Sequence, residues 1–141
     1  MLTSVNIFSD VAVYIQIENE IRYAIASGKL KAGDKLPSVR EIAERLKINP
    51  NTVNKAFRDL EIMGLVYSRR GMGVFVGDGV DAKCREDCRR NIIERLHEVT
   101  QEAKAAGVPK KLLTDTIAKS FASKSNLYDE VPKAVMDLAK S

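Results

Sequence analysis

The chain has 141 residues, of which 45% are apolar and 30% charged, a composition that fits one ordinary globular domain or two small ones. No run approaches the roughly 18 apolar residues of a membrane span, and the N-terminus lacks a basic region followed by an apolar core. These absences predict a cytoplasmic protein with no membrane partner. The net charge of +4 is compatible with nucleic-acid binding but does not require it.

The first strong helical pattern covers residues 10–27. Tyr14, Ile17, Ile21, Ala24 and Ile25 recur at spacings of three and four, and Gly28 follows as a stop signal. We expect this helix to be structural, because a helix pair alone buries too little apolar surface to fold. Residues 5–8 before it form either an extended arm or a strand. Residues 29–35 after it read as a turn, and a short strand around Leu30 could add to a later hairpin.

A capping signal marks the next helix. Ser38 and Glu41 have the spacing at which the hydroxyl caps the helix and the carboxylate reaches back to the Ser38 N–H. The helix should therefore begin just after Ser38 and bury Ile42, Ala43 and Leu46 before a polar break at residues 47–49.

Asn49 and Pro50 open a third helix, since asparagine is a good N-cap and proline suits the first helical position. One face is apolar through Leu60, and Gly64 ends the helix. The outward residues are Asn51, Thr52, Asn54, Lys55 and Arg58. An amide at Asn51 or Asn54 can pair with adenine, while Lys55 can hold phosphate or guanine.

The pattern then changes to two β-prone runs, residues 65–67 and 74–76, around a turn that carries Arg69, Arg70 and Gly71. Two short helices followed by a hairpin with a basic tip would place a helix in the DNA major groove and a wing beside it. Four cations and no carboxylate lie between Arg45 and Arg58. Alone, such a run favours a solvated surface, but in this context it favours DNA.

A second unit follows a linker at residues 77–79. From residue 83 an apolar stripe runs along one helix face to a stop signal at Gly107 and Pro109: Cys84, Cys88, Ile92, Leu96, Val99, Ala103 and Ala106. A further helix is expected at residues 109–122, and a third segment at 126–140 should break at Pro132. About sixty residues in such helices make a poor independent core, so a partner surface should cover the stripe.

The predicted fold class is mainly α with a small β-wing. Residues 1–79 would form a winged helix-turn-helix DNA-binding domain and residues 80–141 a short helical dimerisation domain with a seam at Ile92, Leu96, Val99 and Ala103. The predicted partners are a double-stranded DNA operator with an inverted repeat and a second copy of the chain, because a symmetric interface uses the same patch twice.

The runs YIQI (14–17), IASGKL (25–30), GDKLPSVR (33–40), NPNTVNKA (49–56) and LEIMGLV (60–66) resemble the GntR family of bacterial transcription regulators. The short tail, including EAKAAGV (102–108), is similar to the YtrA-like subfamily, whose tails are too small for a large effector domain. The resemblance implies a regulator, often a repressor and often encoded beside transporter genes.

The resemblance also implies roles for individual residues. Arg40 would contact phosphate or a base, Asn51 and Thr52 would lie where the recognition helix enters the groove, and Gly71 would approach the minor groove. The predicted DNA-binding set is Ser38, Arg40, Asn49, Asn51, Thr52, Asn54, Lys55, Arg58, Arg69, Arg70 and Gly71. Pro50 and Asn54 stand where the fatty-acid-responsive branch has arginines, so the operator of that branch does not carry over.

Other chemistry has weaker support in the sequence. Cys84 and Cys88 share a helix face, but His97 lies about 900° of helix rotation beyond Cys88 and so on the opposite side. Two thiols fall short of the usual four metal ligands, so buried free thiols, no metal and no cofactor are expected. No nucleophile with a nearby base and no phosphate-binding loop indicates an enzyme. A tail that binds a small effector, or a metal-responsive sensor, remains the alternative.

Overall fold

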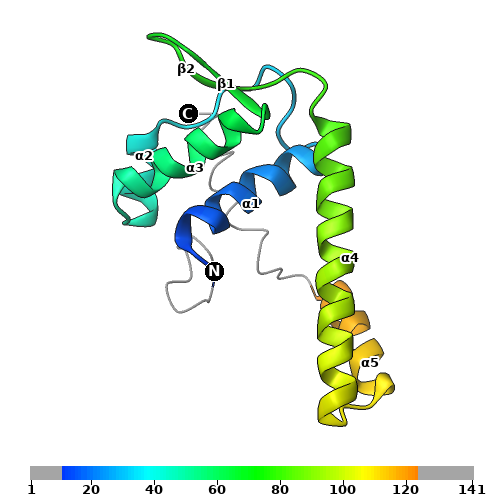
Figure 1. The fold of residues 1–141 in the computed structure, drawn as a ribbon. Helices are drawn as coiled ribbons and strands as arrows, with labels where there is room; N and C mark the ends of the chain where they lie inside the picture. The colour runs from blue at the N-terminus through cyan, green and yellow to red at the C-terminus, as the bar shows by residue number, and fades with distance from the viewer. Residues whose placement is uncertain (1–10, 124–141) are drawn as a thin grey trace.

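A computed structural model describes residues 11–123, in which short helices and a hairpin form a body from which one long helix projects (Figure 1). The elements, in chain order, are α1 (Val13–Ala26), α2 (Val39–Leu46), α3 (Pro50–Ile62), β1 (Val66–Arg69), β2 (Gly73–Val76), α4 (Asp81–Ala106) and α5 (Lys110–Ala122). This order confirms the predicted helix-turn-helix, wing and helical tail. The segments at 5–8 and 126–140, including Pro132, lie outside the described residues.

One apolar core holds α1, α2, α3 and the wing together. Its buried side chains come from each of these elements and include Ile21, Ile42, Val53, Leu60 and Val76, all at most 1% exposed. α1 packs on α3 and on α4, so it forms the centre of the body, and the expected structural role of this helix is confirmed. The helix begins later than expected, at Val13, with Ala12 at the N-cap position and no side-chain cap.

The two predicted capping signals are confirmed. Ser38 Oγ accepts a hydrogen bond from the Glu41 N–H at 3.0 Å, and Glu41 Oε1 accepts one from the Ser38 N–H at 3.4 Å. Asn49 Oδ1 accepts from the Asn51 N–H at 2.8 Å at the start of α3. Between the helices, Lys47 adopts a left-handed conformation with φ 56°, which closes the turn. The two helices are thus joined by a fixed turn.

The wing is an antiparallel pair in the register Val66 with Val76 and Arg69 with Gly73. The expected contribution of Leu30 to it is wrong. The Leu30 N–H donates to Ala24 O at 3.0 Å and its side chain is buried, so this residue folds back over α1 instead. The extra pairing with β2 comes from the segment after it, where Lys35 bridges to Phe75.

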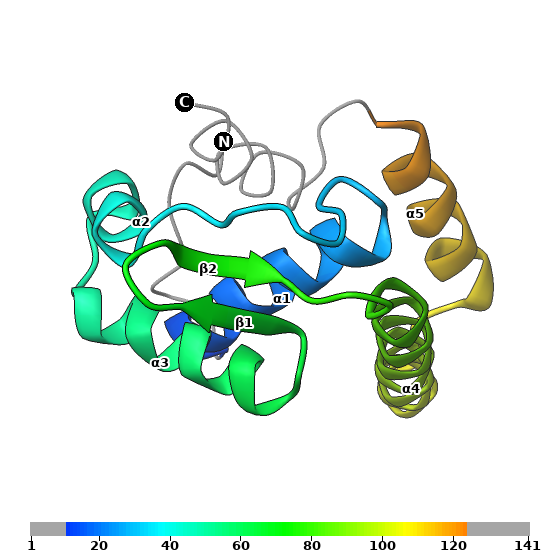
Figure 2. The same ribbon diagram turned by 90° about the horizontal axis from the view of Figure 1, so that it is seen from above.

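α4 starts at Asp81, two residues before the predicted position. The apolar pattern did not reveal this start, because the residues of the first turn are solvent-exposed. The first part of α4 packs against α1, and the rest extends away from the body with α5 beside it (Figures 1 and 2). Gly107 ends α4 with φ 75°, as its position before Pro109 predicted. Cys84 and Cys88 are buried and free, as expected. No helix within residues 11–123 combines the length and apolarity needed to cross a membrane.

Candidate nucleic-acid interface

The outward face of α3 carries most of the predicted DNA-binding side chains. Asn51, Asn54, Lys55 and Arg58 are exposed, and Thr52 is half-buried. The opposite face is anchored by Val53, Ala56, Phe57 and Leu60, all at most 6% exposed. Because this anchoring fixes the helix about its axis, the amides and cations project together from one rigid element.

The predicted residues near the start of each helix have two different roles. The side-chain oxygens of Ser38 and Asn49 are engaged in capping, so the structure accounts for both residues without DNA. The side chain of Arg40 is 87% exposed and forms an ion pair with Glu44 at 3.3 Å. An exposed pair of this kind contributes little to stability and can open easily, so Arg40 is accessible to an anionic ligand.

Lys55 is held more firmly than Arg40. Its ammonium lies 3.1 Å from both carboxylate oxygens of Asp59, one helical turn later on α3. The same ammonium lies 5.0 Å from the centre of the Tyr14 ring on α1, within the range of a cation–π contact. The cation is therefore oriented by groups from two helices.

The wing tip presents the predicted arginines above an aromatic base. The Tyr67 and Phe75 rings stack with their centres 5.7 Å apart, and the Arg69 guanidinium lies 5.8 Å from each ring centre. Arg70 is exposed in the turn. Gly71 has φ 76° with open space around it, so glycine is favoured there by the backbone conformation and not by crowding.

The predicted DNA-binding set omitted Lys35 and Tyr14, although both lie in runs that resemble the family. Lys35 crosses the wing at Gly73, where an added Cβ would come within 2.8 Å of Lys35 Cε. Gly73 therefore leaves room for a third cation near the wing. A glycine at a strand start is a weak hint of such close approach, but the identity of the approaching residue depends on chain pairing that is not local in sequence. Tyr14 was assigned only to the buried face of its helix.

A groove of about 260 Å³ lies where α1 meets α4. Its lining combines Asn19, Arg22 and Tyr23 of α1 with Cys88 and Arg95 of α4, among others. Arg22 Nη2 donates to Asn19 Oδ1 at 2.9 Å, and Arg22 Nη1 is 3.8 Å from the sulfur of Met63. Burial raises the pKa of the Cys88 thiol, so this group is not an activated nucleophile.

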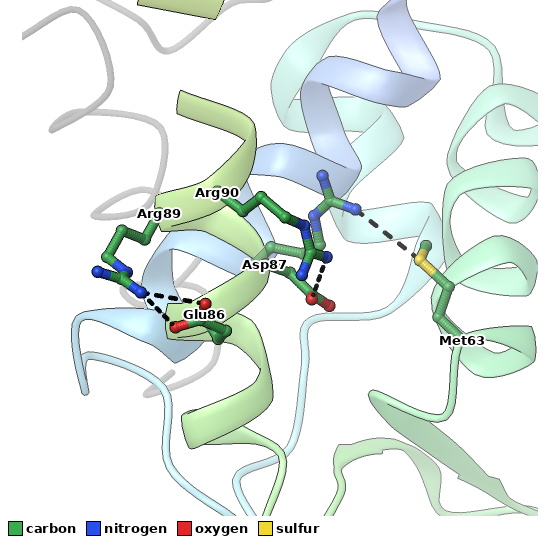
Figure 3. A network of polar contacts seen from close by, with 6 residues as sticks. Met63, Glu86, Asp87, Arg89 and Arg90 are labelled. Carbon is green, nitrogen blue, oxygen red and sulfur yellow. Dashed lines mark hydrogen bonds and ion pairs between the residues drawn. The ribbon is translucent and has the colours of Figure 1, made fainter. Parts of the chain in front are cut away.

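The outer surface of α4 beside this groove is lined by short-range ion pairs. Arg89 contacts Glu86 at 3.1 Å, and Arg90 contacts Asp87 at 2.9 Å (Figure 3). These pairs satisfy charges within the helix itself. Within residues 11–123, no group of three or more metal-ligating side chains gathers closely enough to hold an ion.

The residues predicted to form the dimer seam divide into two groups. Ile92, Leu96 and Val99 are 45%, 44% and 51% exposed, whereas Ala103 is only 7% exposed and already covered within the chain. α5 does not cover the three larger side chains and has no buried residue among its own thirteen described positions. An apolar strip along α4 thus remains open to solvent.

A helix-turn-helix whose second helix presents amides and cations beside a basic wing defines a winged helix-turn-helix DNA-binding protein. The sequence matches the family described as "Bacterial regulatory proteins, gntR family" over residues 13–76. It is 36% identical over 114 residues to the HTH-type transcriptional repressor YtrA of Bacillus subtilis (strain 168), covering 81% of this chain and 88% of that protein.

Two further relatives match along most of their length. The uncharacterized HTH-type transcriptional regulator YhcF of the same organism is 33% identical over 115 residues, 80% of this chain and 92% of that protein. The structure of a GntR family transcriptional regulator from Listeria monocytogenes superposes with a TM-score of 0.61 at 33% identity, covering 79% of this chain and 98% of that one. The chain belongs to the GntR family, with YtrA among its near-full-length relatives. It is a DNA-binding transcriptional regulator and not an enzyme.

Proposed function

We propose that the protein is a repressor that binds an inverted-repeat operator as a homodimer and reads bases through α3. The observation that carries this proposal is the exposed row of Asn51, Asn54, Lys55 and Arg58 on a helix whose other face is fully anchored. Arg40 and the wing residues Arg69, Arg70 and Gly71 would bind the backbone on either side of that row. The repressor assignment rests on the similarity to the repressor YtrA of Bacillus subtilis.

Selection of binding sites from random duplex DNA tests this proposal directly. A homodimer that contacts bases through α3 should enrich one short sequence motif in two inverted copies. Asn51→Ala should then lose about 1–3 kcal/mol of binding free energy on the selected duplex and little on random DNA. Arg58→Ala is the matched control on the same helix: if it meets only phosphate, it weakens both duplexes alike. If Asn51→Ala lost the same binding free energy on both duplexes, Asn51 would not contact a base specifically.

The homodimer is supported by the open strip of Ile92, Leu96 and Val99 on α4 and by apolar residues of α5, where Phe121 is 88% exposed. Leaving such side chains in water is unfavourable, and a second copy related by a two-fold axis would cover the same patch on both subunits. Two recognition helices would then address two half-sites about one DNA turn apart.

A second candidate role, the sensing of a small effector, is favoured by the groove between α1 and α4. It lies between the DNA-binding body and the proposed seam, and it is lined by polar groups such as Arg22, Asn19 and Arg95. A small molecule bound in this groove could change the angle between α4 and the DNA-binding body. Replacing residues 81–141 by a foreign dimerisation domain separates dimerisation from effector sensing. If the tail only dimerises, the replacement should restore both operator binding and regulation; if the tail also senses an effector, operator binding should return but regulation by the effector should be lost.

Control of transporter genes is the remaining part of the proposal and rests on the family resemblance alone. Transcript levels of the neighbouring genes, compared between wild type and a deletion strain, test it: repression predicts that transporter transcripts rise in the deletion.

A further inference from the structure

Lys55 is embedded in a cluster of charges that extends beneath the DNA-facing surface. Its ammonium pairs with Asp59 at 3.1 Å and lies 5.0 Å from the ring centre of Tyr14 on α1. Glu18 follows Tyr14 by one turn of α1 as Asp59 follows Lys55 by one turn of α3, and α1 packs on α3, so the two carboxyl groups act on each other across this contact. Glu18 is buried, at 7% exposure, and its Oε1 has no hydrogen-bond partner among the described residues. A buried carboxyl beside a second carboxyl is costly to ionise, because burial and the neighbouring negative charge both disfavour the charged form.

The two carboxyl groups can hydrogen-bond to each other only when one of them keeps a proton, because a carboxylate is an acceptor alone. Burial raises the pKa of Glu18 to about 7, and the hydrogen bond and negative charge of Asp59 add to the effect. The pKa of Asp59 is lowered, first by the hydrogen bond from Glu18 and then by Lys55. When the pair holds one proton, that proton therefore resides on Glu18, and Asp59 keeps the negative charge that faces Lys55.

Among residues 11–123, the other charged groups that act on this pair lie on α1 and α3. Arg22 on α1 and Lys55 on α3 act on Glu18, while Arg58 on α3 also acts on Asp59. α4 contributes Glu94, Arg95 and Glu98 to the groove that Arg22 lines. With its proton, the set of Glu18, Asp59 and Lys55 is neutral; without the proton it carries one net negative charge beside the DNA.

We propose that Asp59 and Glu18 are positioning residues for Lys55, and that the pair enters the operator complex with one proton held between the two carboxyl groups. This inference rests on the proposed contact of Lys55 with DNA. As Lys55 turns towards a phosphate, Asp59 loses part of its counter-charge and meets the negative field of the DNA. Both changes favour the protonated pair, because a nearby negative charge disfavours ionisation of a carboxyl.

Operator binding should therefore take up a proton wherever the free protein has lost it. If the complex keeps the proton throughout and the pKa of Glu18 in the free protein is about 7, uptake is about half a proton at pH 7, and affinity falls about fivefold from pH 7 to pH 8. Below pH 6 the affinity should level off. A carboxylate that must be ionised for binding would give the opposite result, an affinity that rises with pH.

The test measures the dissociation constant of the selected duplex from pH 6 to 8.5 at fixed salt. Glu18→Gln imitates the protonated carboxyl, so it should bind at pH 8 as tightly as wild type does at pH 6, with a flat pH profile. Glu20→Gln is the matched control: burial raises the pKa of Glu20 to about 8, but Glu20 is not part of this cluster, so this variant should keep the wild-type profile.

A flat wild-type profile, or a Glu18→Gln profile that follows wild type, would overturn the inference. If Glu18→Gln does not fold, calorimetry of wild type in two buffers with different ionisation enthalpies replaces it, and zero proton uptake at pH 7 is the contrary result. The proposed function fails differently, since no duplex would then be selected or bound specifically at any pH.

Discussion

Replacing Leu96 by glutamate should separate the proposed dimer into monomers. Full burial of a leucine side chain contributes about 2 kcal/mol, and Leu96 is 44% exposed in the single chain, so a partner that covers the rest would gain about 1 kcal/mol per copy. Because both copies change, Leu96→Ala should weaken dimerisation by about 2 kcal/mol, or roughly thirtyfold in the dissociation constant. Leu96→Glu adds the desolvation of two carboxylates and should cost several kcal/mol more.

Sedimentation at micromolar concentration, together with titration of the selected duplex, measures both effects. Leu96→Glu should sediment as a monomer and lose operator affinity while circular dichroism shows an intact fold. Gln101→Glu is the matched control, because Gln101 is exposed on the same helix and lies about 140° around its axis from Leu96, so this variant should stay dimeric. A wild-type protein that is already monomeric, binds with full affinity and protects a single half-site would refute the dimer reasoning.

Three further predictions concern the DNA-binding body. Arg40→Ala should reduce the salt dependence of binding by about one unit if this exposed side chain meets a phosphate, and an unchanged slope removes it from the interface. The double variant Arg69→Ala, Arg70→Ala should lose footprint protection beside the major-groove contacts, where undiminished protection would indicate a merely solvated turn. Burial raises the pKa of Glu20 to about 8, so the folded state holds this proton more tightly than the unfolded state. Stability should therefore fall as pH rises from about 5 through 8, and Glu20→Gln should flatten that fall in thermal melts.

The parts of the fold that sequence reasoning located well are those set by local chemistry. The starts of α2 and α3 were predicted because Ser38 and Asn49 act on backbone groups two or three residues away. The end of α4 was predicted because Gly107 supplies a left-handed residue at the required place. Where no side chain caps the helix, as at Ala12 before α1, the predicted start was wrong by a turn.

The parts that were missed depend on contacts between distant segments. Lys35 reaches the wing because the chain before α2 runs back along β2, with the Leu36 N–H donating to Val74 O at 2.8 Å. The spacing of apolar residues does not show that the segment before α2 will pair with β2. The partnership of Glu18 with Asp59 was hidden for the same reason: each residue looks like an ordinary solvated carboxylate until α1 packs against α3.

The connection between β2 and α4 decides how a dimer would read DNA. Residues 77–79 resemble a flexible linker in sequence, but the Gly77 N–H donates to Leu65 O at 2.9 Å, and a Cβ at Gly77 would lie 3.3 Å from that same oxygen. Cys84, one turn into α4, is 1% exposed within the core that also holds α1. α4 is therefore fixed to the body by packing and not tethered to it. A dimer joined through α4 would hold its two copies of α3 at a set separation, so the distance between half-sites would follow from the fold, and duplexes with altered spacing should bind as if they carried a single half-site.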